Sequence, residues 1–208
     1  MRCKLIITAL LLTALTGLQG KSTKLITSWK NPKFSSPHFQ QILVIGMSDN
    51  APVRADFEDA LSQSIGQNNV HAIPGNTLLL RPESGKLDIE YVRAQIKEHH
   101  IDAVVVSRLV SVKNEVTYIP GQAYAVPYPY YYSFYGYYSA LYPVVYSPEY
   151  LRTDKTVRIE TNLYATSSGE GDLVWTAISD TMNPNNVTKA INAVVKTVVK
   201  QMQKDDVL

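Results

Sequence analysis

Four histidines are the side chains of this sequence best suited to binding a metal ion or moving a proton. They are His38, His71, His99 and His100. None has the spacing with which a helix presents two ligands to one metal ion, and adjacent residues of a helix point about 100° apart. We therefore expect no metal site. We expect His99 and His100 to close a helix, where positive charge is favourable.

A second candidate site lies at Asp49, where the first buried strand should end. In open α/β sheets, ligands bind beyond the carboxyl ends of the strands, so an enzyme or ligand-binding site near Asp49 is one hypothesis. The loop 46–50 has one glycine and no lysine, and the chain has no Gly-x-Ser-x-Gly motif. The simpler interpretation is that Asp49 or Asn50 caps the next helix. We therefore expect no enzyme and no cofactor.

The strongest local signal is a segment rich in tyrosine. Residues 116–148 are 33 residues without a charge, and they hold eleven of the fourteen tyrosines together with five prolines. Proline removes a backbone donor and disfavours helices and central strands, so we expect a long Tyr/Pro-rich excursion over 119–150 between two strands. The candidate binding residues are Tyr124, Tyr128, Tyr130, Tyr131, Tyr132, Tyr135, Tyr137 and Tyr138.

Tyrosine suits contacts between a dry and a wet environment, because its ring buries apolar area while its hydroxyl keeps a polar partner. The segment is therefore suited to an envelope protein, another copy of this chain, the headgroup region of a membrane, or the rings of a glycan. A low-complexity loop that folds back on its own domain is the simpler alternative. Nucleic acid is disfavoured, because stacking on bases normally comes with cations.

Length and charge limit the class of protein. The chain has 208 residues, with 20 Lys and Arg against 18 Asp and Glu, and a formal net charge of +2. This length fits one domain with additions, and the charge lacks the basic excess of a nucleic-acid-binding protein. The single cysteine excludes an internal disulfide.

Residues 1–20 have the order of a secretory signal peptide. Arg2 and Lys4 precede an uncharged apolar run over 5–18, and small residues follow. The run is shorter than the roughly 20 residues of a membrane-spanning helix. We expect cleavage near Gly20 and a location in the periplasm or cell envelope, with membrane association left open.

Hydrophobic periodicity predicts the elements that would hold these sites. An irregular lead-in over 21–40 precedes them, with Trp29 and Phe34 anchored on the core. Strands are expected over 42–46, 70–73, 101–119, 156–165 and 173–178, and helices over about 52–66, 88–100 and 184–204. Two strand–helix–strand units in tandem imply a parallel core. We expect an α/β fold over 41–204: a three-layer-like mixed sheet with a parallel strand–helix–strand core, a late antiparallel hairpin and a C-terminal packing helix.

Apolar spacing also predicts which side of each helix is buried. The buried side of the first helix should be Val53, Phe57, Ala60, Leu61 and Ile65, and that of the second Ile89, Val92 and Ile96. The buried stripe of the last helix should be Val187, Ala190, Ile191, Val194, Val195, Val198, Val199 and Met202. Asp56, Glu58 and Asp59 should spread over the helix surface, with Arg54 and Glu58 as a modest ion pair. Leu87 should staple onto Val92.

The order of these elements, with Gly-Glu-Gly-Asp-Leu-Val-Trp at 169–175, resembles small bacterial envelope lipoproteins of unknown function. Their domain is similar to the amino-terminal domain of the Tol translocation protein and to the activator lipoproteins of penicillin-binding proteins. The resemblance covers residues 40–203 outside the tyrosine-rich part, and it implies a non-catalytic role in binding or assembly. Residues 18–20, Leu-Gln-Gly, resemble those before the lipid-carrying cysteine of lipoproteins, but Lys21 stands in its place.

The sequence therefore predicts an exported, non-catalytic envelope protein that binds or assembles through its tyrosine-rich segment. A self-assembling structural module is one alternative. An enzyme or ligand-binding site near Asp49 is another. A deep polar pocket with a second carboxylate at the strand ends would favour an enzyme, whereas a capped and filled helix start would oppose it.

Overall fold

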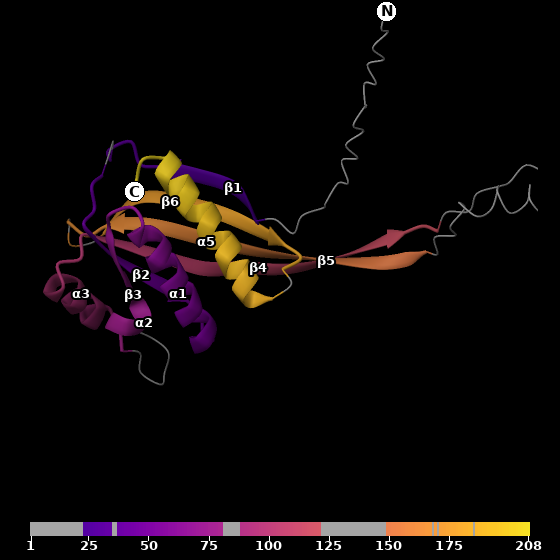
Figure 1. Ribbon diagram of the computed structural model, residues 1–208, viewed down its shortest axis with the longest axis horizontal. Helices are drawn as coiled ribbons and strands as arrows, with labels where there is room; N and C mark the ends of the chain where they lie inside the picture. The colour runs from indigo at the N-terminus through magenta and orange to yellow at the C-terminus, as the bar shows by residue number, and fades with distance from the viewer. Residues whose placement is uncertain are drawn as a thin grey trace, which may run out of the picture.

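The computed structural model describes residues 23–34, 37–80, 88–121, 149–167, 169, 171–184 and 186–208. In this part the chain forms a six-stranded mixed sheet in the order β1-β6-β5-β4-β2-β3, with helices on both faces (Figure 1). The strands are β1 (Thr23–Lys30), β2 (Gln41–Met47), β3 (His71–Pro74), β4 (Ala103–Ile119), β5 (Tyr150–Ala165) and β6 (Asp172–Met182). The helices are α1 (Ala51–Gly66), α2 (Gly75–Leu78), α3 (Ile89–Glu98) and α5 (Val187–Lys204).

The centre of the sheet is parallel, as the strand–helix–strand pattern predicts. β2 pairs in parallel with both β3 and β4, and the later strands β4, β5, β6 and β1 pair antiparallel. Ile42, Leu43 and Val44 are fully buried because helices cover both faces of this central strand. The predicted fold class, with three layers, a late hairpin and a C-terminal helix, is confirmed.

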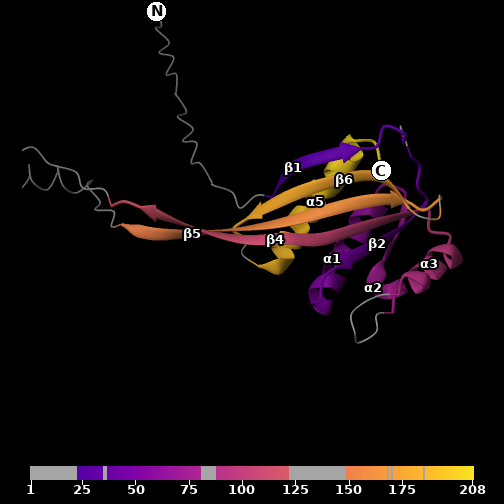
Figure 2. The same ribbon diagram turned by 180° about the vertical axis from the view of Figure 1, so that it is seen from behind.

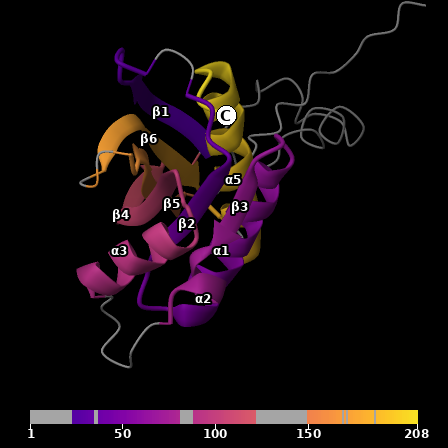
Figure 3. The ribbon, with the colours of Figure 1, turned by 90° about the vertical axis from the view of Figure 1, so that its left-hand side faces the viewer.

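The larger core lies between the sheet and the pair of helices α1 and α5, which run side by side over one face (Figures 1 and 3). The buried sides of the two helices match the predicted apolar spacing at most positions. The buried residues of α5 are Ile191, Val194, Val195, Val198, Val199 and Met202. Val187 differs, because it opens the first turn of α5 and its side chain is 51% exposed.

The smaller core lies under α3, on the opposite face. Its buried residues are Leu43, Leu79, Ile101 and Val104, with Val92 and Ile96 packed against them. The predicted inward position of Ile89 is wrong, since its side chain is 72% exposed. Tyr91 covers this small core instead, and its hydroxyl accepts the backbone N–H of Leu80 at 3.2 Å.

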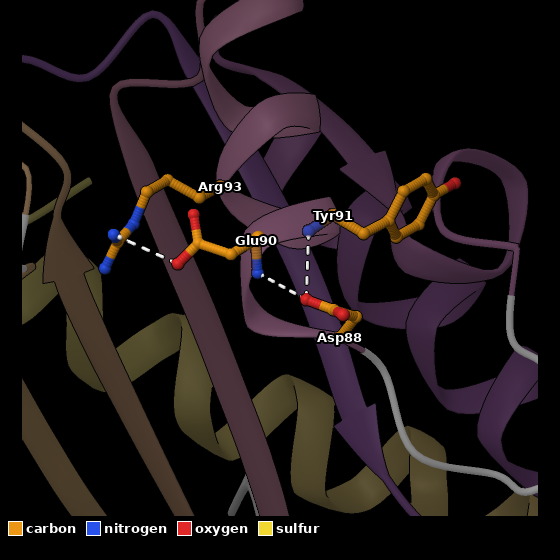
Figure 4. A network of polar contacts seen from close by, with 4 residues as sticks. All are labelled: Asp88, Glu90, Tyr91 and Arg93. Atoms are coloured by element: carbon orange, nitrogen blue, oxygen red, sulfur yellow. Dashed lines mark hydrogen bonds and ion pairs between the residues drawn. The ribbon is translucent and has the colours of Figure 1, made fainter.

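A side-chain cap begins α3, and a backbone cap ends it. The Asp88 carboxylate accepts the backbone N–H groups of Glu90 at 2.7 Å and Tyr91 at 3.4 Å, as predicted, and Arg93 pairs with Glu90 (Figure 4). At the other end His99 is the C-cap, and His100 adopts a left-handed backbone with φ of 50°. The predicted staple from Leu87 lies outside the described residues.

The predicted irregular lead-in over 21–40 is wrong in its first part. Residues 23–30 form the edge strand β1, because their backbone groups complete an antiparallel ladder with β6. Trp29 was expected on the core, but it lies opposite Thr176 on the face away from α5 and is 48% exposed. Phe34 does pack against the larger core, as predicted.

Two strands run far beyond the others. β2 pairs with β4 only as far as Arg108, and β6 pairs with β5 only from Thr156 onward. Residues 109–119 and 149–155 therefore make up a ribbon that projects from the body, here called the arm (Figures 1 and 2). Among the described residues, 114–119 and 150–155 pair only with each other. The predicted strand over 109–119 is confirmed, whereas β5 begins at Tyr150 rather than at Thr156.

No helix among the described residues is both long enough and apolar enough to cross a membrane.

Candidate functional site: an apolar pocket and the arm beside it

The start of α1 is a completed helix cap. The Asn50 side chain accepts the backbone N–H of Val53 at 3.1 Å, and Pro52 stands in the first turn, as predicted. Asp49 is exposed next to this cap and does not line the neighbouring pocket.

A pocket of about 410 Å³ lies beside this loop, between α1, α5 and the sheet. Most of its walls are aliphatic or aromatic. They are formed by Val53 and Phe57 of α1, Leu109 and Val112 of β4, Val157 and Ile159 of β5, and Val187, Ala190, Ile191 and Val194 of α5. Gly46, Met47 and Ser48 close the end next to β2. Its volume is within the range of small-molecule sites, roughly 300–1,000 Å³.

Charge in the pocket lining is entirely positive. Arg54, Arg108 and Lys155 contribute cations, and no carboxylate is among the described lining residues. Arg108 is already paired, because its guanidinium contacts the Glu160 carboxylate at 2.5 Å. The second carboxylate that an acid–base enzyme would need is therefore not found in this lining. The described residues also contain no cluster of His, Cys, Asp and Glu suited to a metal ion.

Glu58 contradicts the prediction that it lies on the helix surface. Its side chain is fully buried under the loop that leaves β2, and Oε1 accepts the backbone N–H of Gly46 at 2.8 Å. Gly75, just after β3, has no room for a side chain, since a Cβ there would lie 2.9 Å from the Val44 carbonyl oxygen and 3.2 Å from Glu58 Oε1. Glu58 therefore fastens α1 to the end of β2 and lies close to Gly75, just after β3.

One face of the arm is largely apolar and continues the floor of the pocket, and the pair Asn114 and Lys155 interrupts it beyond Val112. Val112 and Val157 are paired across the two strands and both line the pocket. Side chains alternate between the two faces of a strand, so Val116, Tyr118 and Leu151 share the face of this pair. Their side chains are exposed by 62%, 56% and 67%.

The opposite face of the arm is polar. It carries Lys113, Glu115, Thr117, Arg152 and Asp154, which alternate with the apolar positions. At its tip it carries the pair Ile119 and Tyr150, and Tyr150 is 53% exposed. The arm is therefore an amphipathic ribbon.

An ion pair between β5 and β6 lies where this polar face joins the body. Arg158 and Asp180 lie opposite each other on β5 and β6 and form two hydrogen bonds of 2.7 Å. The hydrogen bonds from Arg158 lower the pKa of the Asp180 carboxyl, against the effect of burial. Such paired contacts between a guanidinium and a carboxylate are geometrically specific.

Asn183 braces the point at which the arm leaves β6. Its backbone is left-handed, with φ of 46°, and its side chain accepts the Lys155 N–H at 2.7 Å and donates to Asp154 at 2.8 Å. The hydrogen bond from Asn183 lowers the pKa of Asp154, with a further contribution from Arg152. Asparagine tolerates this backbone conformation better than most residues.

At the tip of the arm, the Tyr118 hydroxyl donates a hydrogen bond of 2.5 Å to Glu149, and this contact raises the pKa of Tyr118. The tyrosine-rich segment joins the two strands beyond this point. All eight predicted binding tyrosines, at positions 124, 128, 130, 131, 132, 135, 137 and 138, lie outside the described residues. Their binding role stays a prediction.

Sequence reasoning missed two parts of this site. The pocket combines residues from six elements, and no local pattern links Val112 to Ala190. The apolar face of the arm did have a signal, because Val112, Val116 and Tyr118 fall on one side of the strand, with Asn114 as the polar exception. Its continuation through Leu151 was hidden, because β5 was expected to start later.

No protein-family model and no curated protein sequence matches the chain. Solved structures with a similar fold include the PelC dodecamer from Paraburkholderia phytofirmans, which is 9% identical over 86% of this chain and 97% of that chain, with a TM-score of 0.43. Lipoprotein GNA1162 from Neisseria meningitidis is 13% identical over 79% of this chain and 99% of that chain, with a TM-score of 0.40. A minor lipoprotein from Acinetobacter baumannii is 10% identical over 80% of this chain and 94% of that chain, with a TM-score of 0.29.

Bacterial lipoproteins are thus among the solved structures that this fold resembles. At such identities and TM-scores the matches carry no conclusion about function. The finer resemblance to the Tol translocation protein and to the activator lipoproteins stays a prediction.

Proposed function

We propose that this chain is an exported, non-catalytic protein of the cell envelope that assembles with copies of itself through the arm. The observation that carries the proposal is the uncovered apolar face of the arm. Val116, Tyr118 and Leu151 are each more than half exposed on one side of a ribbon whose other side is charged. Contiguous exposed apolar surface of this kind is typical of interaction sites.

The backbone of the arm supports the same proposal. Among the described residues, 114–119 of β4 and 150–155 of β5 pair with no third strand, and the outer edge of β4 is unpaired beyond Arg108. A strand edge with unpaired N–H and C=O groups is a template for pairing with another chain. An isolated two-stranded ribbon is also marginally stable in water, so the arm would gain stability from added strands.

A second copy of the chain is the partner that the charges favour. Between residues 109–119 and 149–155 the arm carries the cations Lys113, Arg152 and Lys155 and the anions Glu115, Glu149 and Asp154. A ribbon with equal numbers of both signs does not repel itself. Its apolar face can pack on the same face of a copy, which is the isologous arrangement of most symmetric dimers.

In this proposal the tyrosine-rich segment adds contact area to the interface. It is joined in sequence to the arm at Gly121 and Glu149, and we propose that its tyrosines contact the same partner. Tyrosine supplies large contact area at low cost in conformational entropy. Export of the chain rests on the signal-peptide pattern of residues 1–20.

Sedimentation velocity of the purified protein over a hundredfold range of concentration tests the proposal. We expect the sedimentation coefficient to rise with concentration from that of the monomer to that of a defined oligomer. A monomer at every concentration would contradict self-assembly. A monomer that binds an envelope protein, lipid vesicles or a glycan would mean that the arm binds that partner rather than a second copy of the chain.

A further inference from the structure

We infer that the apolar pocket between α1, α5 and the sheet is a binding site for a single-chain amphiphile with an anionic head group, such as a fatty acid. The inference is independent of self-assembly, because it concerns a concave site in the body of the protein. A site of about 410 Å³ is large enough for a small ligand.

The interior of the pocket suits a hydrocarbon chain. Phe57, Ile191 and Val194 at its inner wall are at least nine-tenths buried and present only carbon atoms of their side chains. The hydroxyl groups in the lining are already engaged. Ser107 bonds to Thr161 at 3.0 Å, and Thr181 bonds to Thr23 at 2.7 Å. An apolar chain can therefore enter without leaving these hydroxyls unsatisfied.

The mouth of the pocket is also apolar. Met47, Leu109, Val112 and Val187 line it, and their side chains are exposed by 45–56%. Large apolar side chains that remain this exposed around a concave site are stabilised when a ligand covers them. A chain that extends from the inner wall to the mouth would cover them.

The positive charge of the pocket lining favours an anionic head group. Arg54 reaches the pocket from α1, and Lys155 reaches it from β5 on the other side, while no described lining residue is acidic. One terminal nitrogen of Arg54 donates to the Ser48 carbonyl at 2.9 Å, but its Nε is buried and meets no acceptor among the described residues. Lys155 forms no ion pair with the described residues. A carboxylate would supply the missing acceptor and the opposite charge.

Fluorescence titration of the full chain with dansyl-undecanoate tests this site. We expect saturable binding of one probe per chain. Dodecanoate should displace the probe more effectively than dodecyltrimethylammonium, which has the same chain and a cationic head. Absence of saturable binding, or equal displacement by the two competitors, would overturn the inference.

Variants separate the pocket from other apolar surfaces. Ala190→Trp fills the pocket from α5 and should weaken probe binding at least about tenfold, which is about 1.4 kcal/mol. Thr188→Trp, on the exposed side of the same helix, is the matched control and should bind as the wild type does. Equal binding by both variants would overturn the assignment of the pocket.

The charge variants test the head group separately. Arg54→Gln together with Lys155→Gln should remove the preference for dodecanoate, whereas Lys113→Gln on the opposite face of the arm should keep it. An unchanged preference in the double variant would overturn the role of these cations.

If Ala190→Trp fails to fold, a diazirine fatty acid is photo-cross-linked to the wild type and the adducts are mapped by mass spectrometry. Adducts on the inner wall of the pocket would support the site. Adducts confined to other surfaces would overturn it.

Discussion

Tyr118 and Leu151 lie directly opposite each other across the two strands of the arm, and their side chains are exposed by 56% and 67%. They share a face with the pair Val112 and Val157, which lines the pocket in the body of the protein. This face is therefore apolar at the pocket and again at the tip of the arm, with the pair Asn114 and Lys155 between the two. The body is stabilised by its own two cores, and Val116, Tyr118 and Leu151 belong to neither of them. These side chains are therefore available for contacts with other molecules.

The two tyrosines at the tip of the arm offer a matched test of this surface. Tyr118 and Tyr150 are about equally exposed, at 56% and 53%, but they lie on opposite faces. We expect Tyr118→Ser to weaken self-association about tenfold, because it removes apolar area from the proposed interface. Tyr150→Ser should change it much less. Sedimentation equilibrium measures both constants, and equal effects would contradict the assignment of the interface to one face.

Three tyrosines of the segment test its share in assembly. We expect Tyr130→Ser, Tyr131→Ser and Tyr135→Ser, made together, to weaken self-association while the urea midpoint of the protein stays unchanged. The physical reason is that these rings would contribute contact area rather than core packing. A large fall in the urea midpoint would mean instead that the rings belong to the core.

The buried hydrogen bond of Glu58 should stabilise the fold. Glu58→Ala leaves the buried N–H of Gly46 without its acceptor, so we expect a loss of about 1–3 kcal/mol in the free energy of unfolding. Asp56→Ala, on the exposed side of the same helix, is the control and should change the stability by less than about 0.5 kcal/mol. Urea denaturation measures both, and similar small losses would contradict the fastening role of Glu58.

The lowered pKa of Asp205 should make the free energy of unfolding depend on pH. Burial by itself would raise the pKa of this carboxyl, but hydrogen bonds from Trp175, Gln201 and Ser28 outweigh burial and lower it. Trp175 is fully buried, and its indole N–H lies 2.8 Å from Asp205.

A lowered pKa in the folded state means that the ionised carboxylate stabilises the fold above its unfolded pKa of about 3.9. This contribution is lost as pH falls through the folded pKa. Asp205→Asn should therefore be less stable than the wild type at pH 7, and the difference should shrink toward about pH 3. Urea denaturation at several pH values measures it. A difference that stays constant with pH would contradict this linkage.

The parts of the fold that sequence could predict are those with a strong local pattern. The aliphatic run of β2 and the stripe of α5 show the periodicity of a buried strand and of a helix packed on a sheet. Asn50 and Asp88 occupy their caps as predicted. In each of these cases the residues near in sequence determine the structure.

The predictions from sequence were wrong where contacts between residues far apart in the chain determine the structure. β1 is a strand because β6 offers its edge, and nothing local in residues 23–30 reveals that neighbour. Glu58 looks like a surface residue of an amphipathic helix until the Gly46 N–H is placed beside it. The pocket depends on the packing of α1 and α5 over β4 and β5, so its lining could not be assembled from sequence patterns.

Photo-cross-linking in the native cell, with one probe at residue 116 and another at residue 113, tests self-assembly through the arm most directly. Val116 lies on the apolar face and Lys113 on the polar face, three positions apart on the same strand. We predict that the probe at 116 gives abundant adducts between copies of this chain and that the probe at 113 gives few. Adducts from 116 only to a different protein, or no adducts from 116 in protein that is folded and exported, would contradict self-assembly through the arm.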